Sequence, residues 1–511
     1  MSVEILTIGG VFVLSKSKYC SYTQCPKKLW LDVNKPELAV KDASSESRMD
    51  EGNVIGDLAM RLFGDFVEVT VYKADGKLDL TKMIADTKEL MKKDTPVICE
   101  ASFSYNGDYC AVDILRREGD GYAIYEVKSS TGPKDVYITD ISYQKYVLEH
   151  SGVNVVGTYL VCINSDYVFD GVLKLSELFE IVNVADEVDE EIIAVEENVK
   201  DANKVLAGKS EPEVDLFMGC HKPYKCPFRQ YCRRDLPSPS VFDLYGTELH
   251  YDKMLDYYQR GIYSFEELFK DKKIMKKKIC SLQIDHEIHD LETHVDKDGI
   301  KDFLNTLRYP LYFLDFETMQ TVIPEFVGTK PYAQIPFQYS LHYIENEGGE
   351  LYHKEFLAES GEDPLRKIAE RLCEDIPDNA CVIVFNQVFE RGRIGELASY
   401  FPDLSEHLLK IRENIRDLLV PFRKGYYYNR RMNGSFSIKS VLPAIFPNDP
   451  SLDYHNLEGI HNGGEAMTVF PKIKDLPPEE QAITRKNLLK YCELDTYATV
   501  KVWEELVRVS K

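Results

Sequence analysis

The sequence lacks any apolar run that approaches the roughly 20 residues needed to cross a membrane. Its first apolar stretch, ILTIGGVFVL, follows Glu4 and has no basic leader, so we expect no signal peptide. We also find no internal repeat and no low-complexity tract. These absences lead us to expect a cytoplasmic protein without a membrane partner.

Positive charge is also scarce. The chain has 62 lysines and arginines against 85 aspartates and glutamates, which gives a net charge of −23. This balance argues against a globally basic coat for nucleic acid, although it leaves room for a local basic channel. Active sites built from carboxylates would themselves make the total charge more negative.

The length of 511 residues predicts two or more domains, and the hydrophobic fraction of 44% is that of a globular protein. The proline- and serine-rich segment DLPSPSVFDLYG marks a boundary. We expect an N-terminal domain over residues 1–237, a helical connector over 238–304 and a C-terminal domain over 305–511. The last part alternates strands with helices, which predicts the α/β class.

An apolar run in the C-terminal part, YPLYFLDFETMQ, ends near two carboxylates, Asp315 and Glu317. Residues two apart in a strand point to the same face, so these side chains should project together. A buried charge is unfavourable unless it is paired or binds a metal, and ligands of α/β sheets gather beyond the carboxyl ends of strands. The pair indicates a site for hard divalent cations. The alternative is a strand end that has reached solvent.

Two later segments could complete this site. ACVIVFNQVFERGRIGEL predicts a strand followed by a helix, with Asn386 and Glu390 at the junction. NLLKYCELDTYATVKVWEEL predicts a helix on which Tyr491 and Asp495, four residues apart, share a face. Four carboxylates could hold two metal ions about 4 Å apart, while the tyrosine orients or helps deprotonate the attacking water. The alternative for the tyrosine is a residue that only packs by its ring.

These elements resemble the DEDD 3′–5′ exonucleases, which have an RNase H-like fold. Their D-x-E motif matches Asp315 and Glu317, and the Y-x-x-x-D motif of their tyrosine subclass matches Tyr491 and Asp495. Their second motif, an Asn followed by an Asp on a helix, is similar to FNQVFE, with Glu390 at the acidic position. The resemblance implies Mg²⁺ or Mn²⁺ bound by these carboxylates. Glutamate is one methylene longer than the usual aspartate, so the inner-shell geometry differs.

A second carboxylate group lies in the N-terminal part. Asp113 is late in the strand-like run DYCAVDILRRE, while Glu126 and Lys128 alternate in GYAIYEVKSS and share a face. The two acids could bind a divalent metal, and the lysine could hold the attacking water and offset phosphate charge. The alternative is a surface hairpin with a cross-strand ion pair.

This arrangement resembles the PD-(D/E)XK nucleases of the RecB-like branch. Glu100 lies on the preceding strand, and YQKYVL is similar to the branch's Gln/Tyr motif, with Gln144 as the match and Tyr146 as a weaker assignment. Gly56 stands where many members have a metal-binding histidine. The acids Asp113 and Glu126 would be the metal ligands. The resemblance implies the catalytic set Asp113, Glu126, Lys128 and Gln144.

Four cysteines flank this N-terminal group. GCHKPYKCPFRQYC contains Cys220, Cys226 and Cys232, and YTQCPKKLWL contains Cys25. In a cytosolic chain, clustered thiolates favour zinc or an iron–sulfur cluster over disulfides. One cysteine before the core and three after it resemble the iron–sulfur RecB-like nucleases, including AddB and CRISPR-associated adaptation nucleases. The resemblance implies a [4Fe–4S] cluster, with zinc as an alternative and with Cys20 as a substitute for Cys25.

Nucleic acid could bind to the segment PFRKGYYYNRRMNGSFSIKSVLP, which interleaves basic residues with tyrosines. Base stacking combined with phosphate contacts is how single strands are held. The alternative is a hairpin with an exposed polar face. The candidate contact residues are Arg423, Lys424, Tyr427, Arg430 and Arg431.

As a whole, the chain resembles a fusion of two nuclease domains. The leading hypothesis is a metal-dependent nuclease that acts on DNA with single-stranded ends, in repair or defence. One alternative keeps the enzyme class but makes it an RNA 3′–5′ exonuclease. Another is a nucleic-acid-binding scaffold in which the N-terminal nuclease site is degenerate.

Overall fold

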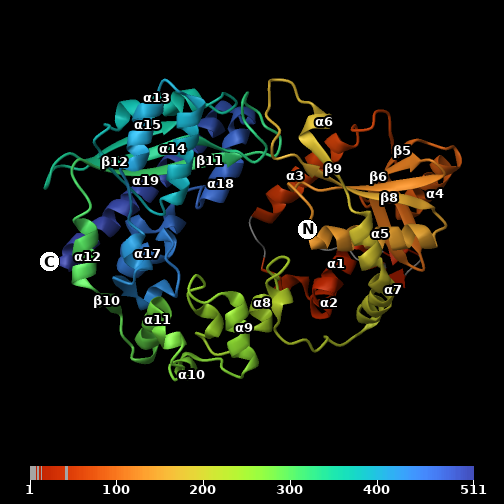
Figure 1. Cartoon of the computed structure of the whole chain (residues 1–511), viewed down its shortest axis with the longest axis horizontal. Coiled ribbons are helices and arrows are strands. Elements are labelled where there is room, and N and C mark those ends of the chain that lie inside the picture. Colours follow the sequence, from red (N-terminus) through yellow and green to blue (C-terminus); the bar gives the residue numbers. More distant parts are fainter. Residues whose placement is uncertain (1–6, 9–10, 13, 41–43) are drawn as a thin grey trace. The chain divides into compact units, whose positions relative to one another are not determined.

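The computed structural model describes residues 7–8, 11–12, 14–40 and 44–511 (Figure 1). The apolar stretch after Glu4 lies partly outside these residues. The chain divides into two compact units, each with a sheet and packed helices, so the predicted α/β class is confirmed. Unit 1 extends to Asp235 and includes Thr321–Tyr332, and unit 2 comprises Leu236–Gln320 with Ala333–Lys511.

In the described residues, unit 1 is built on a seven-stranded sheet of order β4-β5-β6-β7-β8-β9, with β3 paired to β6. Strands β5, β6 and β7 form an antiparallel meander, and β8 runs parallel to β7. Asn106 and Gly107, with φ of 52° and 92°, form the tight turn between β5 and β6. The strands are β3 (Leu14–Ser15), β4 (Val67–Glu68), β5 (Val97–Tyr105), β6 (Asp108–Glu118), β7 (Gly121–Val127), β8 (Val155–Ile163) and β9 (Phe179–Asn183).

Helices pack against this sheet and complete two apolar clusters. One cluster joins strand residues such as Val112 and Ile124 to Ile141 of α5 and Val195 of α7. The other joins Ile114 and Val161 to Ile55 and Ala59 of α3. These contacts bury the apolar side chains whose periodicity predicted the elements. The helices are α1 (Lys16–Gln24), α3 (Ser44–Ala59), α4 (Leu80–Lys92), α5 (Asp135–His150) and α7 (Ala185–Ala207).

Unit 2 contains a five-stranded sheet of order β13-β12-β11-β14-β15. Strands β12 and β13 continue antiparallel from β11, whereas β14 and β15 run parallel to it. The central strand β11 is buried along nearly its whole length, as its almost continuous apolar sequence predicts. The strands are β11 (Leu311–Gln320), β12 (Gln334–Ile344), β13 (Tyr352–Leu357), β14 (Cys381–Val384) and β15 (Ile415–Asp417).

The long C-terminal helix α19 (Pro478–Ser510) packs against β11 and β12. It begins with a proline at its first turn and two glutamates in that turn, both favourable at a helix N-terminus. The helix α14 (Val388–Tyr400) follows β14 directly, as predicted for the second acidic motif. The described part of the chain holds no helix with the length and apolar character of a membrane span.

The predicted helical connector does not form a compact unit of its own. Residues 238–304 cluster with unit 2, where β10 (Thr293–Val295) pairs with β16 (Tyr427–Asn429). The buried residues Ile300 and Phe303 lie on α12 (Lys297–Leu304), which packs against α19. Burial of this apolar face joins the connector to the C-terminal fold. The remaining helices of this segment are α9 (Tyr251–Gln259), α10 (Phe265–Leu268) and α11 (Lys278–Ile288).

The segment between β11 and β12 belongs to unit 1. Phe169 exchanges two backbone hydrogen bonds with it, donating to Thr329 and accepting from Gly328. Val322 joins the apolar cluster that contains α3.

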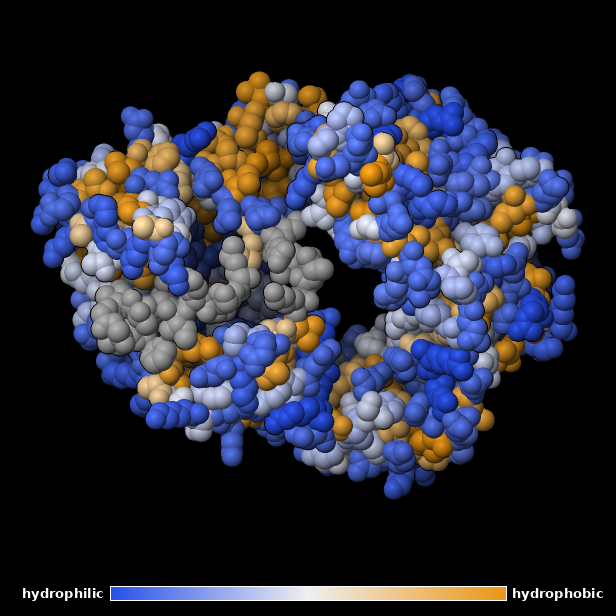
Figure 2. Space-filling model, turned by 180° about the vertical axis from the view of Figure 1, so that it is seen from behind, coloured by the Kyte–Doolittle hydropathy of each residue, from blue (hydrophilic) through white to orange (hydrophobic). Residues whose placement is uncertain are grey.

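The face seen in Figure 2 is mainly hydrophilic, in keeping with the 29% of charged residues.

Candidate active site

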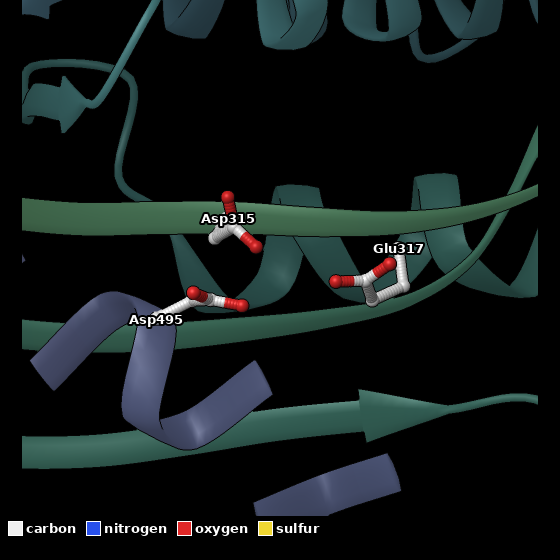
Figure 3. Close-up of side chains that lie close together, drawn as sticks. All are labelled: Asp315, Glu317 and Asp495. Carbon is white, nitrogen blue, oxygen red and sulfur yellow. The ribbon is translucent and has the colours of Figure 1, made fainter. Parts of the chain in front are cut away.

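Three carboxylates of unit 2 converge from two elements. Strand β11 projects Asp315 and Glu317, and α19 supplies Asp495 (Figure 3). One oxygen from each residue lies within 4.8 Å of the others. The pairing of β11 with β12 shifts register just after Glu317, and such bulges commonly re-aim side chains next to functional sites. The predicted D-x-E pair and the distant Asp495 are therefore neighbours in the fold.

Burial dominates the electrostatics of this cluster. It raises the pKa of Asp315 and of Glu317 well above the usual range, and the charge of Asp495 acts in the same direction on both. Burial also raises the pKa of Asp495 to about 6, although hydrogen bonding from Tyr454 and the charge of Lys439 oppose the rise. Three crowded carboxylates cannot all ionise easily without a cation.

The carboxylates of Asp315 and Glu317 have no protein donors: within the described residues, neither accepts a hydrogen bond or forms an ion pair. Asp495 accepts a hydrogen bond from the Tyr454 hydroxyl at 2.6 Å, and the Tyr491 hydroxyl also hydrogen-bonds to it. Hard oxygen ligands with open lone pairs suit Mg²⁺ or Mn²⁺, so the residues present fit a divalent cation.

Glu390 lies near this cluster but outside the group of three. It occupies the first turn of α14, is 3% exposed, and its Oε2 atom has no hydrogen-bond partner. Burial raises its pKa to about 8, with Asp417 acting in the same direction. Its charge contributes to the raised pKa of Asp315. Its direct role as a metal ligand stays a prediction.

The junction before Glu390 is held by Asp417, at the end of β15. Asp417 accepts hydrogen bonds from the backbone N–H groups of Asn386, at 2.9 Å, and Leu419, at 3.0 Å. Asn386 adopts a left-handed φ of 85°, and its side-chain oxygen accepts from Arg423 at 3.2 Å. Sequence reasoning missed Asp417, because β15 is only three residues long (Ile415–Asp417) and leaves no periodic signal.

Tyr491 is 3% exposed and lies on α19 beside Asp495, as predicted. A second tyrosine, Tyr454, makes the hydrogen bond to Asp495, and the two ring centroids are 6.1 Å apart. The Lys439 ammonium lies 5.1 Å from the Tyr454 ring and 5.3 Å from the Tyr491 ring, and it donates to the carbonyl oxygen of His461 at 3.0 Å. Tyr454 and Lys439 carry no motif that sequence reasoning could have used.

In unit 1, the predicted nuclease residues also meet. The Lys128 ammonium lies 2.6 Å from Glu126 Oε1, and Gln144 of α5 donates to Glu126 Oε2 at 2.8 Å. Asp113 accepts from the backbone N–H of Val127 at 2.7 Å. The four side chains form one cluster, and their catalytic role stays a prediction.

Two residues of this cluster were missed. Asp140 lies one helical turn before Gln144 on α5, accepts from it at 3.1 Å, and pairs with Lys128 at 2.7 Å. Lys16, the first residue of α1, lies 2.9 Å from Glu126 and 3.4 Å from Asp113. The spacing of four residues on a helix could have revealed Asp140. Lys16 had no such signal.

The other residues suggested by the RecB-like resemblance are placed as follows. Glu100, with a φ of 55°, interrupts the pairing of β5 with β6 beside Asp113, and burial raises its pKa to about 7. Tyr146 packs against Tyr105 and His150. Gly56 has open space beside it, because a Cβ atom at this position would meet no atom within 4 Å.

The four predicted cysteines line one small cavity of unit 1: Cys25, Cys220, Cys226 and Cys232. The side chain of Gln24 donates to the carbonyl oxygens of Gly219 and Tyr224, which ties the two distant segments together. Burial raises the pKa of the Cys226 thiol to about 11, and the nearby Cys220 acts in the same direction. This set of soft ligands fits zinc or an iron–sulfur cluster.

Cys20 is not part of this cavity lining. Burial raises the pKa of Cys20 to about 12, and the surrounding charges that act on it include Asp140, Lys128 and Lys16. Cys20 therefore lies by the carboxylate cluster of unit 1, and Cys25 is the better candidate ligand.

The predicted nucleic-acid contact segment needs one correction. Tyr427 is 2% exposed because β16 pairs with β10 and its ring meets Phe422, so it cannot stack on a base in this structure. Arg430 pairs with Asp290, and Arg431 lies 3.2 Å from Glu292. Arg423 contacts Asn386, and the Lys424 ammonium lies 5.8 Å from the Tyr426 ring. Contact of these four basic residues with nucleic acid stays a prediction.

Comparison with known proteins gives family context without a function. A family described as a domain of unknown function (DUF2779) matches residues 312–437, a range that contains Asp315, Glu317, Asn386, Glu390 and Asp417. The uncharacterized protein MG366 homolog of Mycoplasma pneumoniae is 24% identical over an alignment of 289 residues, which covers 51% of this chain and 43% of that protein. The uncharacterized protein MG366 of Mycoplasma genitalium is 27% identical over an alignment of 221 residues, which covers 40% of this chain and 32% of that protein. The chain thus spans less than half the length of either relative.

Proposed function

We propose that unit 2 is a metal-dependent nuclease that hydrolyses phosphodiester bonds, with DNA carrying single-stranded ends as substrate and repair or defence as its setting. The observation that carries the proposal is the group Asp315, Glu317 and Asp495. Glu317 and Asp495 are buried and Asp315 is partly buried, and within the described residues none of the three forms an ion pair. Such a group is unfavourable by itself and becomes favourable when it binds hard cations.

The roles of the residues follow from their positions. Asp315, Glu317 and Asp495 would hold Mg²⁺ or Mn²⁺. Glu390, whose charge acts on Asp315, would bind a second ion or its water. A divalent cation bound there would supply an activated water and stabilise the leaving oxygen. Tyr454 fixes the orientation of Asp495 through its hydroxyl. Tyr491 contributes a second hydroxyl beside the same carboxylate.

Lys439 places a positive charge near Asp495 and its two neighbouring tyrosines. Its charge lowers the pKa of Asp495 against the dominant effect of burial. It remains a single ammonium facing several carboxylates, so it cannot neutralise them. We assign it to contact with the phosphate of the bound nucleic acid.

The proposal is tested with the full chain and labelled single- and double-stranded DNA and RNA, in Mg²⁺, Mn²⁺ or EDTA. We expect metal-dependent release of nucleotides from DNA, lost in Asp315→Asn and Asp495→Asn. Asp302→Asn, which changes an exposed aspartate of α12, is the matched control. Cleavage of RNA alone would favour the alternative substrate, and cleavage that persists in both active-site variants would refute the assignment.

For the cysteine cavity of unit 1, we propose a [4Fe–4S] cluster as a structural cofactor. The four thiols come from segments at both ends of the unit, so a bound cluster would contribute directly to its folding. Anaerobic purification followed by an absorption spectrum and iron and zinc analysis tests this. Stoichiometric zinc without iron would replace the cluster by a zinc site.

A nucleic-acid-binding role without cleavage is a second candidate for unit 1 alone. The observation that favours it is Lys16, whose ammonium contacts both acidic residues expected to bind metal.

A further inference from the structure

The carboxylate cluster of unit 1 has a donor on every metal-facing oxygen. Asp113 Oδ1 is paired with Lys16, and its Oδ2 accepts from Val127 N–H. Glu126 Oε1 is paired with both Lys16 and Lys128, and its Oε2 accepts from Gln144. The protein therefore provides internally the interactions that a cation would otherwise provide.

Lys16 is the decisive residue because of where its ammonium lies. It contacts Asp113 and Glu126 together, at 3.4 Å and 2.9 Å, and so occupies the bridging position between the two expected metal ligands. A divalent cation would need to approach these oxygens to about 2.0–2.6 Å, and its charge would repel the ammonium. Cation and lysine cannot share this position.

The charge balance leads to the same result. Asp113, Glu126 and Asp140 bring three negative charges, and Lys16 and Lys128 bring two positive ones. Glu100 is a further acid beside Asp113, and burial raises its pKa to about 7. Asp113 and Glu126 thus already face the two positive charges that one divalent ion would supply. Glu126 is 1% exposed, and such a buried acid requires close compensation.

The backbone holds Lys16 at this place. The preceding strand β3 pairs in parallel with β6, the strand that carries Asp113. The carbonyl oxygen of Leu14 accepts a hydrogen bond from the Tyr143 hydroxyl at 2.5 Å, and Leu14 is fully buried. The start of α1 is therefore anchored to the sheet and to α5. The position of Lys16 in the cluster is thus set by the packing of β3 and α1 against the sheet and α5.

We propose that the Lys16 ammonium takes the place of the divalent cation between Asp113 and Glu126, so that the unit 1 cluster binds no divalent metal. The expected metal of the RecB-like resemblance does not fit this arrangement. A consequence, which rests on the function proposed for unit 2, is that all metal-dependent cleavage by the chain occurs at Asp315, Glu317 and Asp495. Unit 1 would then hold nucleic acid without cutting it.

Manganese binding to the full chain, measured by electron paramagnetic resonance, tests the proposal without relying on activity. In the Asp315→Asn/Asp495→Asn background, we expect no Mn²⁺ site in unit 1. Adding Lys16→Gln should create one, with affinity at least about tenfold higher than in that background, because the freed carboxylates become available. The control is Lys145→Gln, which removes a lysine of α5 paired with Asp189.

Two results would overturn the proposal. One is a Mn²⁺ site in the Asp315→Asn/Asp495→Asn background that disappears on adding Asp113→Asn. The other is a folded Lys16→Gln variant that gains no site. If Lys16→Gln does not fold, Asp113→Asn in the otherwise unchanged chain replaces it: an unchanged Mn²⁺ count supports the proposal, and loss of one ion refutes it. Failure of the unit 2 proposal is seen separately, as a Mn²⁺ count that Asp315→Asn does not change.

Discussion

The two carboxylate clusters of this chain differ in the protein donors that surround their buried acids. In unit 1, Glu126 is 1% exposed and is contacted by two lysines and an amide. In unit 2, Glu317 is 7% exposed, and within the described residues no side chain donates to its carboxylate. A buried acid can be compensated by protein donors or by a bound ligand. Unit 1 shows the first arrangement, and we propose the second for unit 2.

The two clusters differ in the free energy of their ionised carboxylates. Burial raises the pKa of Asp495 from 3.8 to about 6, which corresponds to destabilising its ionised form by on the order of 3 kcal/mol. Asp315 and Glu317 shift in the same direction. In unit 1, the neighbouring carboxylates raise the pKa of Lys16 well above its usual range although burial lowers it. On our proposals, the unit 1 cluster needs no metal ion, and the unit 2 cluster gains stability when it binds a cation.

The largest effect is expected from Asp315→Ala, which should reduce nuclease activity by about a thousandfold or more because it removes a ligand used in the reaction itself. Adding Asp495→Ala should reduce it little further, since groups that act as a unit give strongly non-additive losses. Rates of nucleotide release from end-labelled DNA measure both. Substantial activity in the double variant would show that these carboxylates serve another purpose.

In EDTA, an isosteric substitution should lower the free energy of unfolding when it is made in the unit 1 cluster and raise it when it is made in the unit 2 cluster. Glu126→Gln should destabilise unit 1 by about 3 kcal/mol, because it leaves the half-buried Lys16 and Lys128 without a full counter-charge. Asp315→Asn should stabilise metal-free unit 2 by about 1–2 kcal/mol, because it removes a crowded buried charge. Urea unfolding followed by circular dichroism measures the two changes. The same sign for both variants would contradict the proposed difference between the clusters.

The metal-free protein should lose stability as the pH rises from about 4 to 8. The pKa of Asp495 rises from 3.8 to about 6 and that of Glu390 from 4.5 to about 8, so the folded state binds more protons across this range. Stability is therefore highest below the unfolded pKa values and falls by up to about 1.4 kcal/mol per pH unit for each such group. Mn²⁺ should flatten the curve. Urea unfolding at several pH values tests this, and a metal-free curve that rises over the same range would oppose it.

Local sequence signals predicted the scaffolds of both clusters well. The apolar run of β11 and the helical spacing of Tyr491 and Asp495 are short-range patterns, and both elements form. However, β11 continues to Gln320, so Asp315 and Glu317 lie within the strand and not at its end as expected. The strand β6 forms over Asp108–Glu118, the predicted strand that contains Asp113. Alternation within a strand and spacing within a helix depend on neighbours in sequence, so they can be inferred without the fold.

The residues that compensate or surround the charges could not be predicted this way. Lys16 reaches Glu126 across 110 positions, and Tyr454 reaches Asp495 across 41. Tyr427 lies in a basic and aromatic segment but is buried by pairing with the connector. These contacts are set by tertiary packing, which leaves no periodic trace in the sequence.

The smallest effect, and the sharpest comparison within unit 2, concerns Glu390. Its Oε2 atom is buried without a hydrogen-bond partner, so the side chain is available to a cation or its water. Glu390→Asp restores the residue type of the DEDD motif and should preserve or raise activity, whereas Glu390→Gln should lower it by about tenfold through the lost charge. The two substitutions separate charge from reach, because aspartate keeps the carboxylate and glutamine keeps the length. Initial rates at varied Mn²⁺ concentration provide the measurement. If glutamine retained full activity while aspartate lost it, Glu390 would act by packing, and the cation site would consist of Asp315, Glu317 and Asp495 alone.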